Sequence, residues 1–467
     1  MKNWLWGRPS KRRFFDMNKL IVILITSLIL AACQPANPTL PSAQSVDVPQ
    51  AVEATVLPTS MDTPQSEEIA PPAVVSTPQS SETAAPADIP ASQSASGAVV
   101  HITPNRSEPG DGFGQAVAAD GETIVVGAPL AEGRKGAVYV FVREGNQWRE
   151  TSRLTAADGM ANDVFGQSVA ISGETLVIGA SGHPALGFAT GAAYVFQYQQ
   201  GSWVQTQKLT SSTALDIRFG WSVAIDGQTI VVGAPYRSDQ GEIINVGSAI
   251  VFANDGQGWV QQARLTGRSG GARSSDQFGW SVAIRDSTLA VGAHLANAVY
   301  LYRLSNGVWQ EEAFLKGNGN TGQFGYSVSL AQDTLAVGAP TTSDLNTRAG
   351  AAFVYMRQPN GWAETAQLSS DGLRPGSLLG WSVDLHGDVI VAGARESDGL
   401  ADLEKSGVAY AYQLNGGSSV LLGEFYASNP ARFDHFGHAV AVTPDFILVG
   451  APGQDAASGS VYVISLG

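Results

Sequence analysis

The sequence predicts an all-β protein, a seven-bladed β-propeller of four-stranded antiparallel blades. Three observations indicate this fold: one stretch occurs seven times, each copy has room for four short strands, and the last copy lacks a strand that the beginning of the domain can supply. Internal self-similarity at a spacing of roughly 45–60 residues is typical of propellers and solenoids.

The repeated stretch is clearest at 219–235, which reads F-G-W-S-V-A-I-D-G-Q-T-I-V-V-G-A-P. Each copy opens with Phe-Gly or, once, Leu-Gly, and closes with Gly-Ala. The copies open at Phe113, Phe165, Phe219, Phe278, Phe324, Leu379 and Phe436. Small residues at these two signatures allow backbones to approach closely, so we expect them where neighbouring blades converge.

One unit contains four strand patterns. In the third copy, 221–225 and the β-branched 229–233 flank an Asp-Gly turn, which is a strong hairpin signal. A third strand is expected at 249–252 and a fourth at 259–265, where the fourth begins with tryptophan. Tryptophan also begins this strand at Trp148, Trp203, Trp309 and Trp362. We expect these rings to fill space between twisted blades.

The ends of the domain predict how the ring closes. The last unit stops after its third strand, at 460–465. A strand-like run at 99–103, beginning Val99-Val100-His101-Ile102, precedes the first unit at the spacing that a fourth strand would have. We therefore expect 99–103 to complete the last blade, because a linear array would leave open edges.

These signatures resemble the FG-GAP repeat, which also forms the propeller of the integrin α-subunit. The resemblance covers about residues 99–467 and rests on the recurring Phe-Gly and Gly-Ala-Pro motifs. It implies a seven-bladed propeller that usually mediates binding. The family also contains enzymes, so the fold alone does not assign a function.

One family feature is missing from this sequence. Integrin-type units often carry an Asp/Asn-rich calcium loop between the first two strands. Here that connection is a two-residue turn: Asp120-Gly121, Ser172-Gly173, Asp226-Gly227, Asp286-Ser287, Gln332-Asp333, His386-Gly387 and Thr443-Pro444. Calcium needs about six to eight oxygen ligands. We therefore expect no calcium site, and no motif indicates a cofactor.

Residues 1–33 resemble the signal peptide of a bacterial lipoprotein. Lys11, Arg12 and Arg13 precede an apolar segment at 20–30 that is too short to span a bilayer. Leu-Ala-Ala-Cys33 then resembles a lipobox, and Cys33 is the single cysteine. The resemblance implies a lipidated Cys33 that anchors the exported protein in the cell envelope, at the outer membrane or cell surface, because Gln34 replaces the inner-membrane retention signal. The alternative is an ordinary signal peptide.

Residues 34–98 predict a disordered tether. The segment is rich in Pro, Ser, Thr and Ala and contains no Lys, Arg or aromatic residue, so it cannot bury enough apolar surface to fold. The chain carries a formal net charge of −14, and the propeller has no basic cluster. Nucleic acid is therefore not an expected partner, because it requires a basic footprint.

Loop lengths separate two faces of the propeller. Connections between strands 1 and 2 and between strands 3 and 4 are tight turns, whereas the other two connections are long, varied and on the opposite face. Examples of long loops are 182–190, 236–246, 341–349 and 396–406. Because variable loops on a rigid scaffold usually carry function, we expect this long-loop face to bind a protein or glycan at the cell surface.

Three sets of residues are candidates on this face. The residues that follow Phe-Gly form a ring, and they suit either packing between blades or an aromatic rim that stacks on a sugar or peptide: Gln115, Gln167, Trp221, Trp280, Tyr326, Trp381 and His438. Four carboxylates precede Phe-Gly by two residues, and we expect them to accept backbone hydrogen bonds rather than to bind metal: Asp111, Asp163, Asp276 and Asp434.

The third set would serve an enzyme. It consists of polar residues that depart from the repeat, with nearby acids Glu396 and Asp434: His183, His294, Arg395, His435 and His438. The chain contains no nucleophile elbow, His-Glu-x-x-His motif or phosphate loop. The expected function is therefore non-catalytic binding. The alternatives are an envelope polysaccharide lyase or hydrolase that uses the funnel mouth, and a docking subunit of an envelope complex.

Overall fold

The computed structural model describes residues 99–186, 190–237, 246–267, 276–343, 348–370, 373–399 and 403–466. The expected signal peptide, Cys33 and the tether lie outside these residues, as do parts of several long loops. No helix in the described part of the chain is long and apolar enough to cross a membrane.

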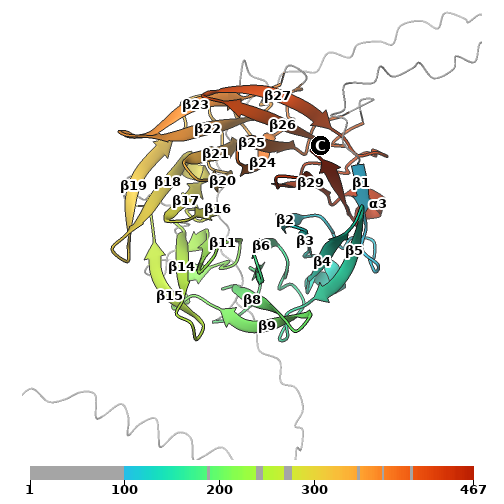
Figure 1. The fold of residues 1–467 in the computed structure, drawn as a ribbon, viewed down its shortest axis with the longest axis vertical. Coiled ribbons are helices and arrows are strands. Elements are labelled where there is room, and N and C mark those ends of the chain that lie inside the picture. The colour runs from blue at the N-terminus through green and yellow to red at the C-terminus, as the bar shows by residue number, and fades with distance from the viewer. Residues whose placement is uncertain are drawn as a thin grey trace, which may run out of the picture. The chain divides into compact units, whose positions relative to one another are not determined.

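Seven four-stranded antiparallel sheets follow one another around a ring, which confirms the predicted fold (Figure 1). The first three blades are β2 (Ala116–Asp120), β3 (Thr123–Ala128), β4 (Ala137–Glu144) and β5 (Gln147–Leu154); β6 (Ser168–Ser172), β7 (Thr175–Ala180), β8 (Ala192–Gln199) and β9 (Ser202–Leu209); and β11 (Ser222–Asp226), β12 (Thr229–Ala234), β14 (Ser248–Asn254) and β15 (Trp259–Leu265).

The next three blades continue the pattern. They are β16 (Ser281–Arg285), β17 (Thr288–Ala293), β18 (Ala298–Ser305) and β19 (Val308–Lys316); β20 (Ser327–Ala331), β21 (Thr334–Ala339), β22 (Ala351–Gln358) and β23 (Gly361–Leu368); and β24 (Leu379–His386), β25 (Val389–Ala394), β26 (Val408–Asn415) and β27 (Ser418–Phe425). In each blade the first strand is innermost, because it contacts the first strands of both neighbouring blades.

The seventh blade takes its strands from both ends of the propeller. It contains β28 (Ala439–Val442), β29 (Phe446–Ala451), β30 (Ser460–Ser465) and, outermost, β1 (Val99–Ile102). β1 pairs antiparallel with β30, so that Val99 lies opposite Ile464 and Ile102 opposite Val461. The ring closes as the sequence predicts, and the last blade has no missing strand.

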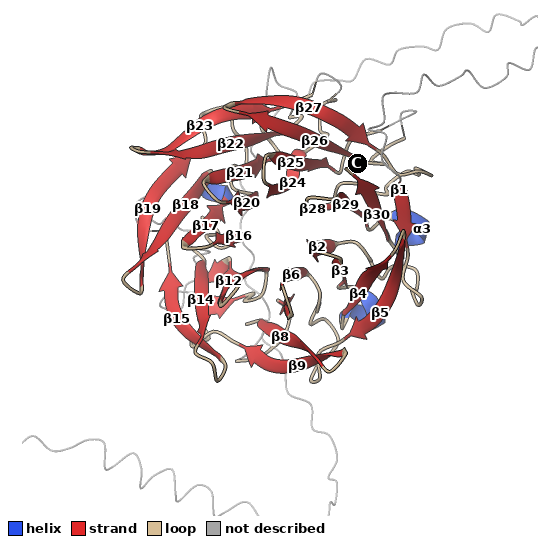
Figure 2. Cartoon of the chain, in the orientation of Figure 1, coloured by secondary structure: helices blue, strands red, loops and turns tan. Residues whose placement is uncertain are grey.

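Strands make up nearly all of the regular structure that is described (Figure 2). The short helical segments α2 (Ala131–Arg134), η1 (His294–Ala296) and α3 (Gln454–Ala457) all lie in connections between the second and third strands of a blade. A further two-stranded sheet joins β10 (Asp216–Ile217) to β13 (Tyr236–Arg237). The short helical segments and the two-stranded sheet lie in the loops, and the four-stranded blades remain regular.

The two repeated signatures meet at the seams between blades. A Cβ atom on the glycine of Gly-Ala would lie only 2.0 or 2.1 Å from the carbonyl oxygen of the Phe-Gly glycine in the next blade. This holds at every seam, including the closing one, where Gly450 faces Gly114. The expected role of these glycines in close backbone approach is confirmed.

Serine hydroxyls reinforce most of the seams. The serine that opens the first strand donates a hydrogen bond of 2.9 or 3.0 Å to the Phe-Gly glycine carbonyl of the next blade. The donors are Ser168, Ser222, Ser281, Ser327 and Ser382. Blades 1 and 7 have Ala116 and Ala439 at this position, so these two seams lack the hydroxyl.

The hydrophobic core is divided among the seams. Each cluster of buried side chains combines residues of two adjacent blades, and the fourth-strand tryptophans belong to five of these clusters. Trp259 and Trp309 are buried, and Trp148 packs edge-on against Phe446 of the seventh blade at 5.1 Å. The expected packing of tryptophan between blades is confirmed.

The long connections lie on one face of the ring. In five blades an amide of the second connection donates to a carbonyl just before Phe-Gly, as Gly182 does to Asp163 and Glu396 to Ser377. The tight turns contact one another at the other end of the blades, where the Asp120 carboxylate accepts a 2.6 Å hydrogen bond from the Gly173 amide. One face of the propeller therefore carries the long, varied loops, and the opposite face carries short turns that are hydrogen-bonded to one another.

Candidate functional site

The ring of residues that follow Phe-Gly surrounds the central channel. All seven residues of this ring line one cavity of about 280 Å³, together with the first residues of the inner strands. Each of the seven side chains is half-buried. The structure therefore brings together every member of the set that the repeat predicts.

Five members of the ring form a continuous aromatic arc across blades 3 to 7. Trp221, Trp280, Tyr326, Trp381 and His438 follow one another with ring centroids 4.6, 5.4, 4.7 and 5.9 Å apart. Their tilted contacts are those of rings that pack on each other. The two remaining blades contribute Gln115 and Gln167, so the channel has an aromatic side and an amide side.

Two polar residues cover parts of the arc. The His294 ring lies 4.2 Å from that of Trp280, and the Arg395 guanidinium lies 4.3 Å from the centre of the Trp381 ring. Both follow a Gly-Ala signature, at a position where four of the seven repeats have proline: Pro129, Pro235, Pro340 and Pro452. The fold does not require a charge or an imidazole there.

Arg395 is the centre of a polar group that we call the open cluster: Arg395, Glu396, Lys405, His435 and His438. The Arg395 Nε and Nη2 atoms lie 2.9 and 2.8 Å from Glu396 Oε1, and Nη1 lies 2.9 Å from His438 Nδ1. Lys405 pairs with the other Glu396 oxygen at 2.9 Å. Burial alone would raise the pKa of Glu396, but Lys405 and Arg395 hold it below its ordinary value.

The hydrogen bonds determine the tautomers of the two histidines. Because a guanidinium cannot accept a hydrogen bond, His438 accepts through Nδ1 and carries its proton on Nε2. His435 Nδ1 lies 3.3 Å from the Arg395 carbonyl oxygen, so it donates there and leaves a lone pair on Nε2. Burial and the Arg395 charge lower both pKa values, that of His438 to about 3, so both rings are neutral at pH 7.

The open cluster borders a pocket of about 430 Å³ between blades 6, 7 and 1. Arg395, His435, His438 and Gln115 form its polar wall, and Leu130 and Phe433 contribute apolar surface. His438 and Gln115 line both this pocket and the channel cavity. The pocket therefore opens beside the amide side of the channel, on the long-loop face.

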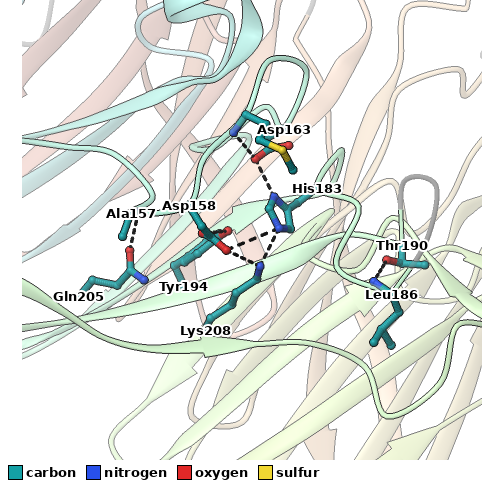
Figure 3. Close-up of polar contacts among 10 residues, drawn as sticks. Ala157, Asp158, Asp163, His183, Leu186, Thr190, Tyr194, Gln205 and Lys208 are labelled. Carbon is teal, nitrogen blue, oxygen red and sulfur yellow. Dashed lines mark hydrogen bonds and ion pairs between the residues drawn. The ribbon is translucent and has the colours of Figure 1, made fainter. Parts of the chain in front are cut away.

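A second polar network lies in blade 2, and we call it the closed cluster: Asp158, Asp163, His183, Tyr194 and Lys208 (Figure 3). His183 Nδ1 lies 2.6 Å from Asp163 Oδ2, and Nε2 lies 2.6 Å from Lys208 Nζ. Lysine cannot accept a hydrogen bond, so His183 donates to Asp163 and accepts from Lys208.

Asp158 completes the closed cluster. Its two oxygens accept hydrogen bonds from Lys208 at 2.6 Å and from the Tyr194 hydroxyl at 2.8 Å. Burial would raise the pKa of Asp158, but these two donors lower it below its ordinary value. His183 and Asp163 are 4% and 1% exposed. Each group thus faces a protein partner, and the network ties the two long connections of blade 2 together.

Three of the four carboxylates two residues before Phe-Gly accept backbone hydrogen bonds, as predicted, and for Asp276 the expectation stays a prediction. Asp111, Asp163 and Asp434 each accept from the amide three residues earlier, at 2.9, 2.8 and 2.6 Å. Among the described residues, no group of three or more His, Cys, Asp or Glu side chains is arranged to hold a metal ion.

The set that would serve an enzyme is divided. Arg395, Glu396, His435 and His438 come together in the open cluster, whereas His183 belongs to blade 2 and His294 packs on the arc at Trp280. Asp434 does not join the open cluster through its side chain, which bonds the Ala431 amide.

Sequence reasoning missed three residues of these sites. Lys208 and Lys405 complete the ion pairs, and Phe433 forms part of the pocket wall. Phe433 departs from the repeat, because it precedes an aspartate at a position where blades 1 and 2 have Gly110 and Asn162. The two lysines carry no such signal, because the equivalent residues Arg153 and Arg134 of blade 1 are also basic.

Comparison with protein families shows that the chain belongs to the FG-GAP repeat family. Seven copies of the repeat match, at residues 97–141, 148–196, 203–252, 259–302, 309–355, 362–412 and 422–464. Each match begins near the outermost strand of one blade and ends in the third strand of the next, so it spans a seam. No curated protein matches the sequence.

Solved propellers share the fold at low identity. The WD40 repeats of RRP9 are 12% identical over 79% of this chain and 97% of that chain, with a TM-score of 0.51. U3-55K is 13% identical over 79% and 98%, with a TM-score of 0.52. The propeller domain of Cps50 (Swd1) from Myceliophteria thermophila is 10% identical over 78% and 99%, with a TM-score of 0.51. These similarities concern the fold alone, and the repeats and propeller together fit an interaction module.

Proposed function

We propose that the protein is a lipid-anchored binding module of the cell envelope that recognises a protein or a glycan through the long-loop face of its propeller. Cys33 is the proposed lipid attachment site, and the outer membrane or cell surface is the proposed location. The ligand-binding surface consists of the channel mouth, with Trp221, Trp280, Tyr326, Trp381 and His438, and the open cluster beside it.

The proposal rests mainly on the identity and position of Arg395. This residue replaces the proline that four other repeats have after Gly-Ala, and the backbone of its loop follows the same path: Glu396 and Ser397 donate to Ser377 and Ala394, as Thr341 and Thr342 donate to Gly322 and Ala339. The propeller can therefore be built without Arg395. Its guanidinium lies between the aromatic arc and the pocket, where a ligand on the long-loop face would meet it.

Arg395→Pro provides the test, because it restores the residue of the repeat. We expect the full-length variant to fold, with a free energy of unfolding within about 1 kcal/mol of the parent. We also expect it to lose at least about tenfold in affinity for isolated cell-envelope fractions or for the active member of a glycan panel. Retention assays measure both proteins side by side.

Ser181→Pro is the matched control, because it makes the same replacement at the equivalent position of blade 2. It should bind like the parent protein. Equal binding by the parent and by Arg395→Pro would contradict recognition at the open cluster.

Anchoring is tested separately at Cys33. More than one acyl chain is needed for stable attachment to a bilayer. In cells, the parent should therefore fractionate with membranes and Cys33→Ser should appear in the soluble exported fraction. Membrane fractionation of both proteins, with mass spectrometry of the N-terminal peptide, checks this, and an unmodified Cys33 in the parent would refute it.

A further inference from the structure

We propose that the pocket between blades 6, 7 and 1 is a subsite for one neutral sugar residue, with Phe433 as its stacking platform and His435, His438 and Gln115 as its hydroxyl-binding groups. This inference rests on the proposed function and names the glycan as its ligand. Three features support it: the backbone of Phe433, the tautomers of the two histidines and the hydrogen-bonding groups of the pocket wall.

Phe433 occupies a backbone position that does not suit an aromatic residue. Its φ is +65°, in the left-handed region, and the equivalent residues Gly110 and Asn162 have φ of +91° and +71°. Glycine and asparagine tolerate this region, whereas other residues there are strained by roughly 1–2 kcal/mol. The Phe433 ring is nevertheless 45% exposed, so full burial in the core does not offset the strain.

Exposed aromatic rings with one apolar face available bind sugars by stacking against their C–H groups. The Phe433 ring lines the pocket, and the cations of Lys405 and Arg432 lie 6.0 and 5.9 Å from its centre. Leu130 contributes further apolar surface. The platform thus combines an aromatic ring with a neighbouring aliphatic wall, which suits a ring-shaped ligand that has apolar faces and polar edges.

The two histidines that line the pocket carry complementary groups. The Nε2 atom of His438 carries a proton, and the Nε2 atom of His435 carries a lone pair, as their Nδ1 contacts require. Among the described residues neither Nε2 has a hydrogen-bond partner, and the Gln115 side-chain amide has none either. A neutral donor, a neutral acceptor and an amide match hydroxyl groups, which both donate and accept.

The hydrogen-bonding groups of the pocket disfavour an acidic ligand. Glu396 pairs with Arg395 and with Lys405, so one of the two positive charges of the open cluster is compensated within the protein. A carboxylate ligand would require donors alone, and the His435 acceptor would repel it. The pocket volume of about 430 Å³ lies within the range of roughly 300–1,000 Å³ that is usual for small-molecule sites.

The test is ligand-observed saturation-transfer NMR on the purified full-length chain. The probes are the methyl glycosides of glucose, galactose, mannose and N-acetylglucosamine, with glucuronic acid and an acetylated tripeptide as the acidic and peptide arms. We expect transfer to the ring protons of at least one neutral glycoside at millimolar concentration, and weaker transfer to the acidic and peptide probes.

Phe433→Asn tests the platform, because it installs the residue that blade 2 has at the equivalent position. We expect affinity for the glycoside to fall at least about tenfold while Tm rises by about 1 °C, since asparagine relieves the left-handed strain. His438→Gln, which installs the ring residue of blades 1 and 2, should also weaken binding. Tyr198→Asn removes a 43% exposed aromatic residue elsewhere on blade 2 and should bind like the parent.

Two results would overturn the inference. The first is the absence of transfer to every neutral glycoside, and the second is unchanged affinity of Phe433→Asn and His438→Gln. If the parent is still retained on envelope fractions in an Arg395-dependent manner while no sugar binds, the proposed function stands and the sugar subsite does not. If neither envelope material nor sugar is bound, both are refuted.

Discussion

Blade 2 and the region between blades 6 and 7 each combine histidine, a carboxylate and a cation in one polar network, yet they differ in how much hydrogen-bonding capacity remains available. In the closed cluster the His183 ring nitrogens face Asp163 and Lys208, and Lys208 also pairs with Asp158. In the open cluster one nitrogen of His438 faces Arg395, and the ring lines a pocket and the channel.

The difference shows which feature indicates a binding site. A dense polar network is by itself a way to satisfy buried groups and fasten loops, and the closed cluster does this in blade 2. The open cluster combines departures from the repeat with polar atoms directed at a cavity, which Phe433 also lines. Unused hydrogen-bonding capacity beside a cavity, rather than charge density, distinguishes the open cluster.

The largest expected effect is on stability, at Asp163. Asp163→Ala removes the acceptor of both the Met160 amide and the His183 ring and leaves Lys208 beside an unpaired histidine. The free energy of unfolding should fall by about 3–4 kcal/mol, since breaking a buried pair strands its partner. Urea denaturation measures this change.

The matched substitution in the other region is Glu396→Gln, which keeps the shape of the side chain but removes its charge from the open cluster. Its cost should be smaller, because Glu396 and its partners are partly exposed. A cost for Asp163→Ala below about 1 kcal/mol would show that blade 2 is not fastened by its polar network.

The contribution of His294, on the channel side, to the pH dependence of stability should be smaller than the effect of Asp163→Ala. Burial lowers the pKa of His294 to about 4. The unfolded state, with a pKa of about 6.5, therefore binds more protons between these values, and stability should be lost as the pH falls from about 6.5 to about 4, by up to about 3 kcal/mol from this residue.

His294→Phe isolates that contribution. The phenylalanine ring can remain stacked on Trp280 but does not titrate, so the variant should lose less stability than the parent on acidification. Unfolding curves at pH 7 and at pH 4.5 for both proteins provide the difference. Parallel pH profiles of the two proteins would contradict a neutral, buried His294.

Much of this fold could be predicted because each copy of the repeat meets the same packing requirement at the same position. Glycine at Gly233 or Gly450 is required by a carbonyl that lies where a Cβ would be, and that requirement recurs at each seam. The closing strand followed from the same spacing, and the ring around the channel followed from its position after Phe-Gly. Periodicity thus specifies where a residue lies within its blade.

The site was less accessible to sequence reasoning because it depends on contacts between blades. Arg395 of blade 6 reaches His438 of blade 7, 43 residues away, and no repeat position indicates that direction. The left-handed φ of Phe433 comes from the loop geometry and is visible in the sequence only by comparison with Gly110 and Asn162. Residues that break the repeat were recognisable, but their partners were not.

The smallest expected effect concerns the seam that underlies the pocket. The seam between blades 7 and 1 lacks the serine hydroxyl that five other seams have, because Ala439 occupies the position of that serine in blade 7. Ala439→Ser should add a hydrogen bond to the Gly114 carbonyl and raise the free energy of unfolding by about 1 kcal/mol. Chemical denaturation measures this gain, and Ser382→Ala, which removes the hydroxyl from the neighbouring seam, should show the opposite sign.

The comparison between the two clusters is tested most directly by measuring binding and melting of two full-length variants, Lys208→Met in the closed cluster and Arg395→Pro in the open cluster. We expect opposite effects of the two substitutions: Lys208→Met melts at a lower temperature than the parent and is still retained on envelope fractions, whereas Arg395→Pro melts like the parent and is not retained. Retention of Arg395→Pro at the level of the parent would contradict the assignment of recognition to the open cluster.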